Sequence, residues 1–177
     1  MVSGATVPEG PEAPQARIHL ADAEATAALG AALAALVRAG DLLILSGDLG
    51  AGKTTLTQGL GRAMGVRGTI ASPTFVIARE HRSTTDGPDL VHVDAYRLGG
   101  LTELDALDLD ATLEESVTVV EWGAGLTEAL AEDRLELTID RARGDAVDTG
   151  RDVTVRGVGA RWADLDGAAL AAAVARP

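Results

Sequence analysis

The sequence predicts an α/β protein of three layers, with a mostly parallel central sheet and antiparallel edge strands. Two observations support this fold class. Short apolar runs, each as long as one buried strand, alternate with segments that have helical spacing. A glycine-rich loop also joins one of these runs directly to a helix. At 177 residues, the chain is expected to form one domain over 17–177, after a disordered tail over 1–16 rich in Pro, Gly, Glu and Ala.

The first third of the chain alternates between strand and helix. A short strand over 17–20 leads to an amphipathic helix that begins after its N-cap, Asp22, and continues to Arg38. The apolar run 42–45 is typical of a buried parallel strand, and the spacing over 53–64 predicts a second helix. A glycine follows each helix, which is a common stop signal.

The middle of the chain is expected to supply three more strands. Segment 75–80 is predicted to be a strand and is followed by a polar loop. The apolar runs 90–94 and 117–120 resemble the run at 42–45 and predict two further buried strands. One or two short helices with acidic caps are expected within 101–115, between these two strands.

The C-terminal part is predicted to complete the sheet and to end in a helix. Segments 134–139 and 152–155 alternate between apolar and polar residues, which is typical of edge or antiparallel strands. The alanine-rich segment 162–175 is predicted to be the final helix. No internal repeat or second domain is visible in the sequence.

Composition excludes several functional classes. The formal net charge of −12 argues against stable, direct binding to nucleic acid, which normally needs a basic face. Segment 98–133 holds ten acidic residues and no Lys, Arg or His, so it is either a solvated acidic surface or a docking face for a basic partner. The absence of cysteine excludes disulfides and cysteine nucleophiles. No apolar run approaches the ~20 residues of a membrane span and no secretory signal is visible, so a cytoplasmic location without membrane contact is expected.

Lys53 is the only lysine in the chain, since every other cation in the Lys+Arg total of 15 is arginine. It lies in the segment 47–54, GDLGAGKT, which fits the phosphate-binding P-loop pattern G-x-x-x-x-G-K-[ST]. A compact ammonium can sit between the β- and γ-phosphates of ATP, where a wide guanidinium would not fit. Thr54 would supply a hydroxyl to Mg²⁺, and Thr55 lies beside it. The motif therefore predicts a P-loop NTPase fold.

A P-loop enzyme also needs an acidic group near the metal ion. Asp94 and Glu121 each end an apolar strand. Because ligands of open α/β sheets bind at the carboxyl ends of strands, both carboxylates could face the phosphates. Each could equally be a helix cap or an exposed acid.

Two other polar residues are given simpler interpretations. His92 is expected to be structural, and no second histidine lies at metal-ligand spacing, so a zinc site is not expected. Ser72 lacks the context of a nucleophile elbow, which argues against a serine hydrolase.

Four segments together resemble the TsaE family, the P-loop ATPases of bacterial tRNA threonylcarbamoyladenosine biosynthesis. They are the P-loop over 47–55, SPTF over 72–75, HVDAYRL over 92–98, and Glu121-Trp122. Their order and spacing match the family over roughly 17–140, and three of the four aromatic residues of the chain fall within them. One departure is the Gly-Ala-Gly sequence after Trp122, where family members often have proline or another acid.

The resemblance implies roles for individual residues. The implied nucleotide-binding residues are Leu49, Gly50, Ala51, Gly52, Lys53, Thr54, Thr55 and Thr26, the last of them near the adenine. Thr54 and Glu121 would bind Mg²⁺, and the implied catalytic set is Lys53, Asp94 and Glu121, with Asp94 positioning water or the metal. Ser72 and Thr74 would lie on a switch-like loop that senses the γ-phosphate.

The resemblance also implies a function. The chain would hydrolyse ATP weakly alone and would drive TsaD-like and TsaB-like partners, which place threonylcarbamoyl on the adenosine next to the tRNA anticodon. It would meet tRNA only through these partners. One alternative is a small-molecule or nucleotide kinase, although only Arg79, Arg82 and Arg97 are available in the central region for a phosphate-covering lid. The other alternative is a nucleotide-binding scaffold that does not hydrolyse ATP.

Overall fold

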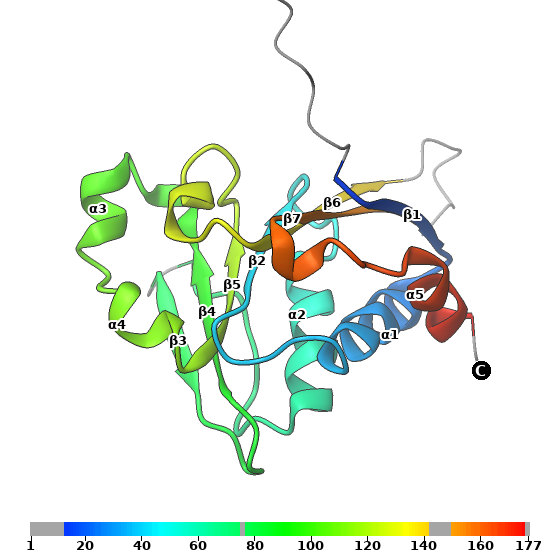
Figure 1. Cartoon of the computed structure of the whole chain (residues 1–177), viewed down its shortest axis with the longest axis horizontal. Coiled ribbons are helices and arrows are strands. Elements are labelled where there is room, and N and C mark those ends of the chain that lie inside the picture. Colours follow the sequence, from blue (N-terminus) through cyan, green and yellow to red (C-terminus); the bar gives the residue numbers. More distant parts are fainter. Residues whose placement is uncertain (1–12, 75–76, 142–149, 176–177) are drawn as a thin grey trace, which may run out of the picture.

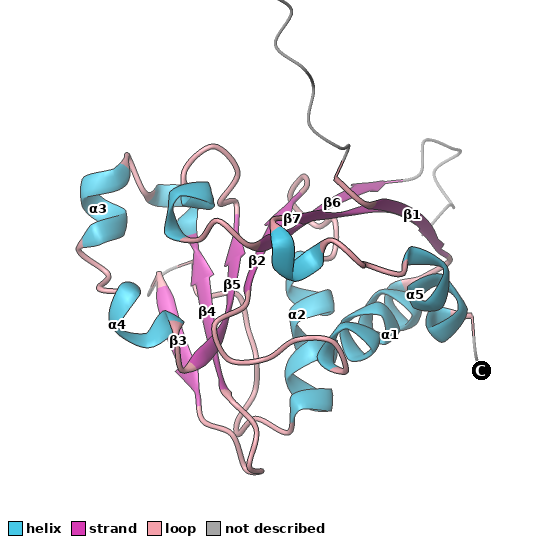
Figure 2. Cartoon of the chain, viewed as in Figure 1, coloured by secondary structure: helices cyan, strands magenta, loops and turns pink. Residues whose placement is uncertain are grey.

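A mixed seven-stranded sheet forms the centre of the computed structural model, which describes residues 13–74, 77–141 and 150–175 (Figures 1 and 2). The strand order is β1-β7-β6-β2-β5-β4-β3. The strands are β1 (Gln15–Leu20), β2 (Leu42–Ser46), β3 (Ala78–His81), β4 (Asp89–Asp94), β5 (Ser116–Glu121), β6 (Arg134–Arg141) and β7 (Arg151–Val158). The central strands β6, β2, β5 and β4 run parallel, while β3, β7 and β1 are antiparallel to their neighbours.

Helices cover both faces of the sheet. The α-helices are α1 (Ala23–Ala34), α2 (Lys53–Met64), α3 (Leu101–Asp105), α4 (Asp110–Leu113) and α5 (Gly167–Val174). Short 3₁₀ helices are η1 (Ala95–Arg97), η2 (Thr127–Leu130) and η3 (Ala160–Trp162). Helices α1, α2 and α5 gather on one side of the sheet, and α3 and α4 lie on the other (Figure 1). None of the helices within the described ranges is long and apolar enough to cross a membrane.

The alternation of strand residues divides the interior into two cores. In β2, Leu43 and Leu45 pack with the helices α1, α2 and α5, whereas Leu42 and Ile44 belong to the core on the opposite face. All four side chains are at most 1 % exposed, so a continuous apolar run is required at this central strand. The predicted three-layer α/β fold is therefore confirmed.

Several predicted boundaries were wrong. The first helix ends at Ala34 instead of Arg38. The next residues form a turn in which the N–H groups of Leu36 and Val37 donate to the Leu33 carbonyl, and the Arg38 N–H then donates to the Asp41 carboxylate. Strand β1 begins at Gln15, within the segment predicted to be a disordered tail.

Other differences concern the sheet edges and the last helix. The segment 152–155 lies in β7, which is antiparallel as predicted but is an interior strand, since β1 covers it. The strand predicted over 75–80 begins only at Ala78, and 75–76 lie outside the described residues. The final helix begins at Gly167 after its N-cap Asp166, because Trp162 belongs to η3 instead.

Helices α1 and α2 approach each other closely through two glycines, Gly30 and Gly59. A Cβ added at Gly59 would collide with the Ala27 carbonyl, and one at Gly30 would collide with the Leu56 carbonyl. We expect Gly59→Ala to lower the free energy of unfolding by about 3 kcal/mol in urea denaturation, despite its better helix propensity. Gly100→Ala is the control, since nothing lies within 4 Å of its added Cβ. Equal stability of the two variants would contradict close helix packing.

Candidate nucleotide-binding site

A cleft of about 230 Å³ opens where β2, β4 and β5 end and α2 begins. The predicted site residues that line it are Leu49, Gly50, Gly52, Lys53, Thr54, Thr55, Asp94 and Glu121, together with Ser72 and Thr74. Two predicted residues do not line it. Ala51 is buried in the core, and the Thr26 side chain packs beside Gly52 while its hydroxyl donates to the Asp22 carbonyl at 2.9 Å.

The P-loop has the backbone conformation that its glycines allow. Gly50 and Gly52 have φ angles of 74° and 113°, in the region where a side chain would be strained. Gly52 also precedes the first residue of α2, so the loop leads directly into the N-terminus of a helix, where backbone N–H groups favour anions. This arrangement is suited to a phosphate group.

Two arginines that sequence analysis missed hold the loop from outside. Arg141 donates to the carbonyls of Leu49 and Gly50 at 3.3 Å, and Arg151 donates to the Ala51 carbonyl at 2.8 Å. They lie at the end of β6 and the start of β7, paired with each other across the two strands. No local pattern links them to the P-loop, because only the sheet order brings β6 next to β2.

Lys53 is almost buried and is held by acceptors of the chain itself. Its Nζ donates to the carbonyls of Gly47 at 2.6 Å and Asp48 at 3.0 Å, and lies 4.0 Å from the centre of the Trp122 ring. Burial lowers the pKa of Lys53, although the nearby carboxylates, Glu121 first, act in the opposite direction. Lys53 therefore lines the cleft with acidic groups close by.

Because Lys53 is the only lysine of the chain, amine-directed labelling of a lysine reports on this position alone. Because only the neutral amine reacts and burial lowers the pKa, we expect labelling to reach half its maximum below the pH of about 10.4 typical of an exposed lysine. ATP should protect Lys53, and the N-terminal amine, as the second reactive group, should react equally with and without nucleotide. Peptide mass spectrometry measures both. Unchanged labelling of Lys53 in saturating ATP would contradict its predicted role as a phosphate ligand.

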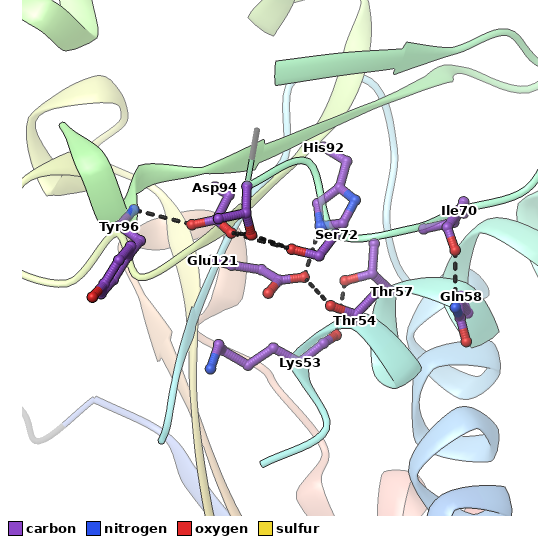
Figure 3. A network of polar contacts seen from close by, with 11 residues as sticks. Lys53, Thr54, Thr57, Gln58, Ile70, Ser72, His92, Asp94, Tyr96 and Glu121 are labelled. Atoms are coloured by element: carbon purple, nitrogen blue, oxygen red, sulfur yellow. Dashed lines mark hydrogen bonds and ion pairs between the residues drawn. The ribbon is translucent and has the colours of Figure 1, made fainter. Parts of the chain in front are cut away.

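Glu121 is joined to both the P-loop helix and the neighbouring strand. Its Oε1 accepts a hydrogen bond from the Thr54 hydroxyl at 2.9 Å and contacts His92 Nε2 at 2.8 Å (Figure 3). The carboxylate is almost completely buried, so it is not the exposed acid that remained possible from the sequence. Thr54 and Glu121 thus present a hydroxyl and a carboxylate side by side.

This pair fits Mg²⁺. Magnesium in phosphate sites takes one or two protein ligands and completes its shell with phosphate oxygens and water. Within the described ranges, no group of three or more His, Cys, Asp or Glu residues could hold a metal ion.

Asp94 lies next to Glu121, because the two residues are paired in the parallel register of β4 and β5. Its Oδ2 accepts from the hydroxyls of Thr74 at 2.5 Å and Ser72 at 3.2 Å, and its Oδ1 accepts from the Tyr96 backbone N–H at 3.0 Å (Figure 3). The residue is therefore both the N-cap of η1 and part of the cleft wall. Through these hydrogen bonds, Asp94 connects the segment that contains Ser72 and Thr74 to the cleft.

Trp122 forms the remaining wall of the cleft. It follows β5 with a φ of 61°, which is unusual for a bulky residue, and its backbone N–H donates to the Leu45 carbonyl at 3.0 Å. Its ring lies against Lys53 and also 5.6 Å from the ring of Tyr96. The aromatic residues singled out in the sequence thus include one that contacts the P-loop lysine directly.

Comparisons with known proteins agree on one family. The model of the family "Threonylcarbamoyl adenosine biosynthesis protein TsaE" matches residues 20–151. A TsaE protein of Streptomyces coelicolor is 65 % identical over 144 residues, which cover 81 % of this chain and 97 % of the relative. A TsaE protein of Bacillus subtilis is 39 % identical over 141 residues, covering 78 % and 84 % of the two chains. The crystal structure of Bacillus subtilis YdiB has a TM-score of 0.67 and 34 % identity, covering 86 % of this chain and 92 % of that one.

Proposed function

The chain belongs to the TsaE family of tRNA threonylcarbamoyladenosine biosynthesis, and we propose that it binds ATP with Mg²⁺ and hydrolyses it to drive a partner complex. The observation that carries this proposal is the convergence of the P-loop, Thr54, Asp94 and Glu121 on one cleft. A lone P-loop would indicate only phosphate binding. The two carboxylates at neighbouring strand ends add the groups that hydrolysis needs.

Each residue of the cleft would have a distinct part in hydrolysis. Lys53 would exchange the Gly47 and Asp48 carbonyls for phosphate oxygens, which are stronger acceptors for an ammonium. Thr54 and Glu121 would hold Mg²⁺, which neutralises charge on the phosphate oxygens when bound. The carboxylate of Asp94 would orient the attacking water and accept its proton.

The partners would be the TsaD-like and TsaB-like proteins that transfer the threonylcarbamoyl group, in the cytoplasm. Ser72 and Thr74 bond to Asp94, so a change at this carboxylate would be passed to the segment that follows them. Such coupling would let the nucleotide state control docking. The net charge of −12 supports a role in which the partners, and not this chain, hold the tRNA.

The kinase alternative is less well supported. None of Arg79, Arg82 and Arg97 lines the cleft, and Arg82 forms ion pairs with Glu80 and Asp89 instead. Product analysis separates the two reactions, since a kinase yields a phosphorylated acceptor and an ATPase yields free phosphate.

Phosphate release from ATP, measured with and without the two partners and tRNA, tests the proposal. We expect feeble release by the isolated chain and a marked change when the partners are added. Vigorous turnover that the partners leave unchanged would overturn the partner-driving role. Thr54→Ala and Glu121→Ala test the scaffold alternative: if these variants still bind ATP and support tRNA modification, hydrolysis is not needed.

A further inference from the structure

His92 lies directly behind the proposed metal-binding carboxylate. The side chain is fully buried, and its Nε2 is 2.8 Å from Glu121 Oε1, the oxygen that also accepts from the Thr54 hydroxyl. Because a carboxylate only accepts hydrogen bonds, Nε2 carries the proton and donates it. Within the described part of the chain, His92 Nδ1 is buried and has no hydrogen-bond partner.

A buried nitrogen without a hydrogen-bond partner lowers the stability of the fold. Packing alone does not require a histidine at position 92. Leu90, two residues earlier on β4, and Val119, its register partner on β5, are both fully buried apolar residues of the core on the same face. An apolar side chain would fill that space without leaving a polar atom unsatisfied. The histidine is therefore explained by its single hydrogen bond to Glu121.

Two hydrogen bonds meet at one oxygen of this carboxylate. Oε1 accepts from the Thr54 hydroxyl and from His92 Nε2. The Thr54 hydroxyl can donate its hydrogen bond to Oε1 only while the carboxylate group keeps its present orientation about the side-chain axis. His92 provides the second contact that holds it (Figure 3).

We propose that His92 is a positioning residue that orients the Glu121 carboxylate, so that Thr54 and Glu121 bind Mg²⁺ together with the nucleotide. This inference rests on the proposed function, because it assumes that ADP or ATP binds in the cleft with Mg²⁺. His92 itself touches neither the nucleotide nor the metal ion. Its contribution is therefore to the metal dependence of binding, and not to nucleotide binding alone.

Two amide substitutions separate this role from simple space filling. The amide nitrogen of His92→Gln can reach the place of Nε2, whereas that of His92→Asn reaches only the place of Nδ1. Affinity of the full chain for fluorescent mant-ADP is measured at equilibrium with Mg²⁺ and with EDTA. We expect Asn to reduce the gain in affinity from Mg²⁺ at least tenfold, with metal-free affinity unchanged, and Gln to restore most of the gain.

His81→Asn is the matched control. His81 is also a buried histidine with one unpartnered nitrogen, but it lies on β3 and does not contact Glu121. Its substitution should leave the gain in affinity from Mg²⁺ unchanged.

A double-mutant cycle is a second test of the positioning role. In a chain that already carries Glu121→Ala, His92→Asn should have no further effect on the gain in affinity from Mg²⁺.

The outcomes are distinct. Loss of the gain in both His92 variants, or in neither, would overturn the positioning role, and so would equal loss of affinity with and without Mg²⁺. If the unsubstituted chain binds mant-ADP with no metal dependence, the proposed magnesium site fails and this inference fails with it. If Mg²⁺ raises the affinity of the unsubstituted chain and raises that of His92→Asn equally, the positioning role is refuted while the proposed magnesium site stands.

Discussion

Replacing Lys53 with either alanine or arginine is expected to lower the affinity for ATP at least 100-fold, which corresponds to about 2.7 kcal/mol of binding free energy. Alanine removes the ammonium. Arginine keeps the charge but presents a planar group in a space bounded by two carbonyls within 3.0 Å of Nζ and by the Trp122 ring. The two variants should therefore behave alike, which would not be so if charge alone mattered.

Isothermal titration of the full chain with ATP and Mg²⁺ measures this effect. Arg62→Ala removes another cation from the same helix, but from its exposed last turn, and should leave affinity within a factor of two or so of the original. Tight ATP binding by Lys53→Arg would mean that the loop can admit a guanidinium. The explanation for the single lysine would then be wrong.

Replacing Asp94 with asparagine is expected to slow ATP hydrolysis by about 100-fold or more while nucleotide affinity changes little. Asparagine keeps the shape and one carbonyl oxygen for the Tyr96 N–H, so η1 should retain its cap. The negative charge that would orient water and accept its proton is lost, and general-base contributions are of this size. Partner-stimulated phosphate release measures the rate, and mant-ADP titration measures the affinity.

Asp89→Asn is the control for this substitution. Asp89 begins the same strand that Asp94 ends, and it bonds to the Ser83 N–H and Arg82, away from the cleft. Its variant should retain the original rate. A fully active Asp94→Asn would leave Glu121 as the only candidate for the catalytic carboxylate among the residues predicted from the sequence.

Local patterns in the sequence were sufficient to predict much of the site. The P-loop is contiguous, so its residues identify it without any knowledge of the fold. Asp94 and Glu121 could be brought together in advance because both end apolar runs, and parallel strands of one sheet share the edge at which they end. The α/β class followed from the same runs.

The features that were missed depend on contacts between distant parts of the chain. Arg141 and Arg151 reach the P-loop only because β6 lies beside β2, and strand order cannot be predicted from alternation alone. The hydrogen bond between His92 and Glu121 could not be predicted either, because the two residues lie 29 positions apart on different strands. The first helix was predicted to be too long, and the turn that follows it is held partly by Arg161, from the far end of the chain.

The order of the sheet has a consequence for the synthesis of the protein. Strand β2 carries the P-loop, but both of its neighbours, β5 and β6, are translated much later, and the arginines that hold the loop come last. While the nascent chain is still shorter than about residue 116, its ribosome-bound part contains the complete P-loop motif without either of the strands that flank β2. The cleft at the end of β2 is therefore completed only after β6 and the start of β7 have been translated.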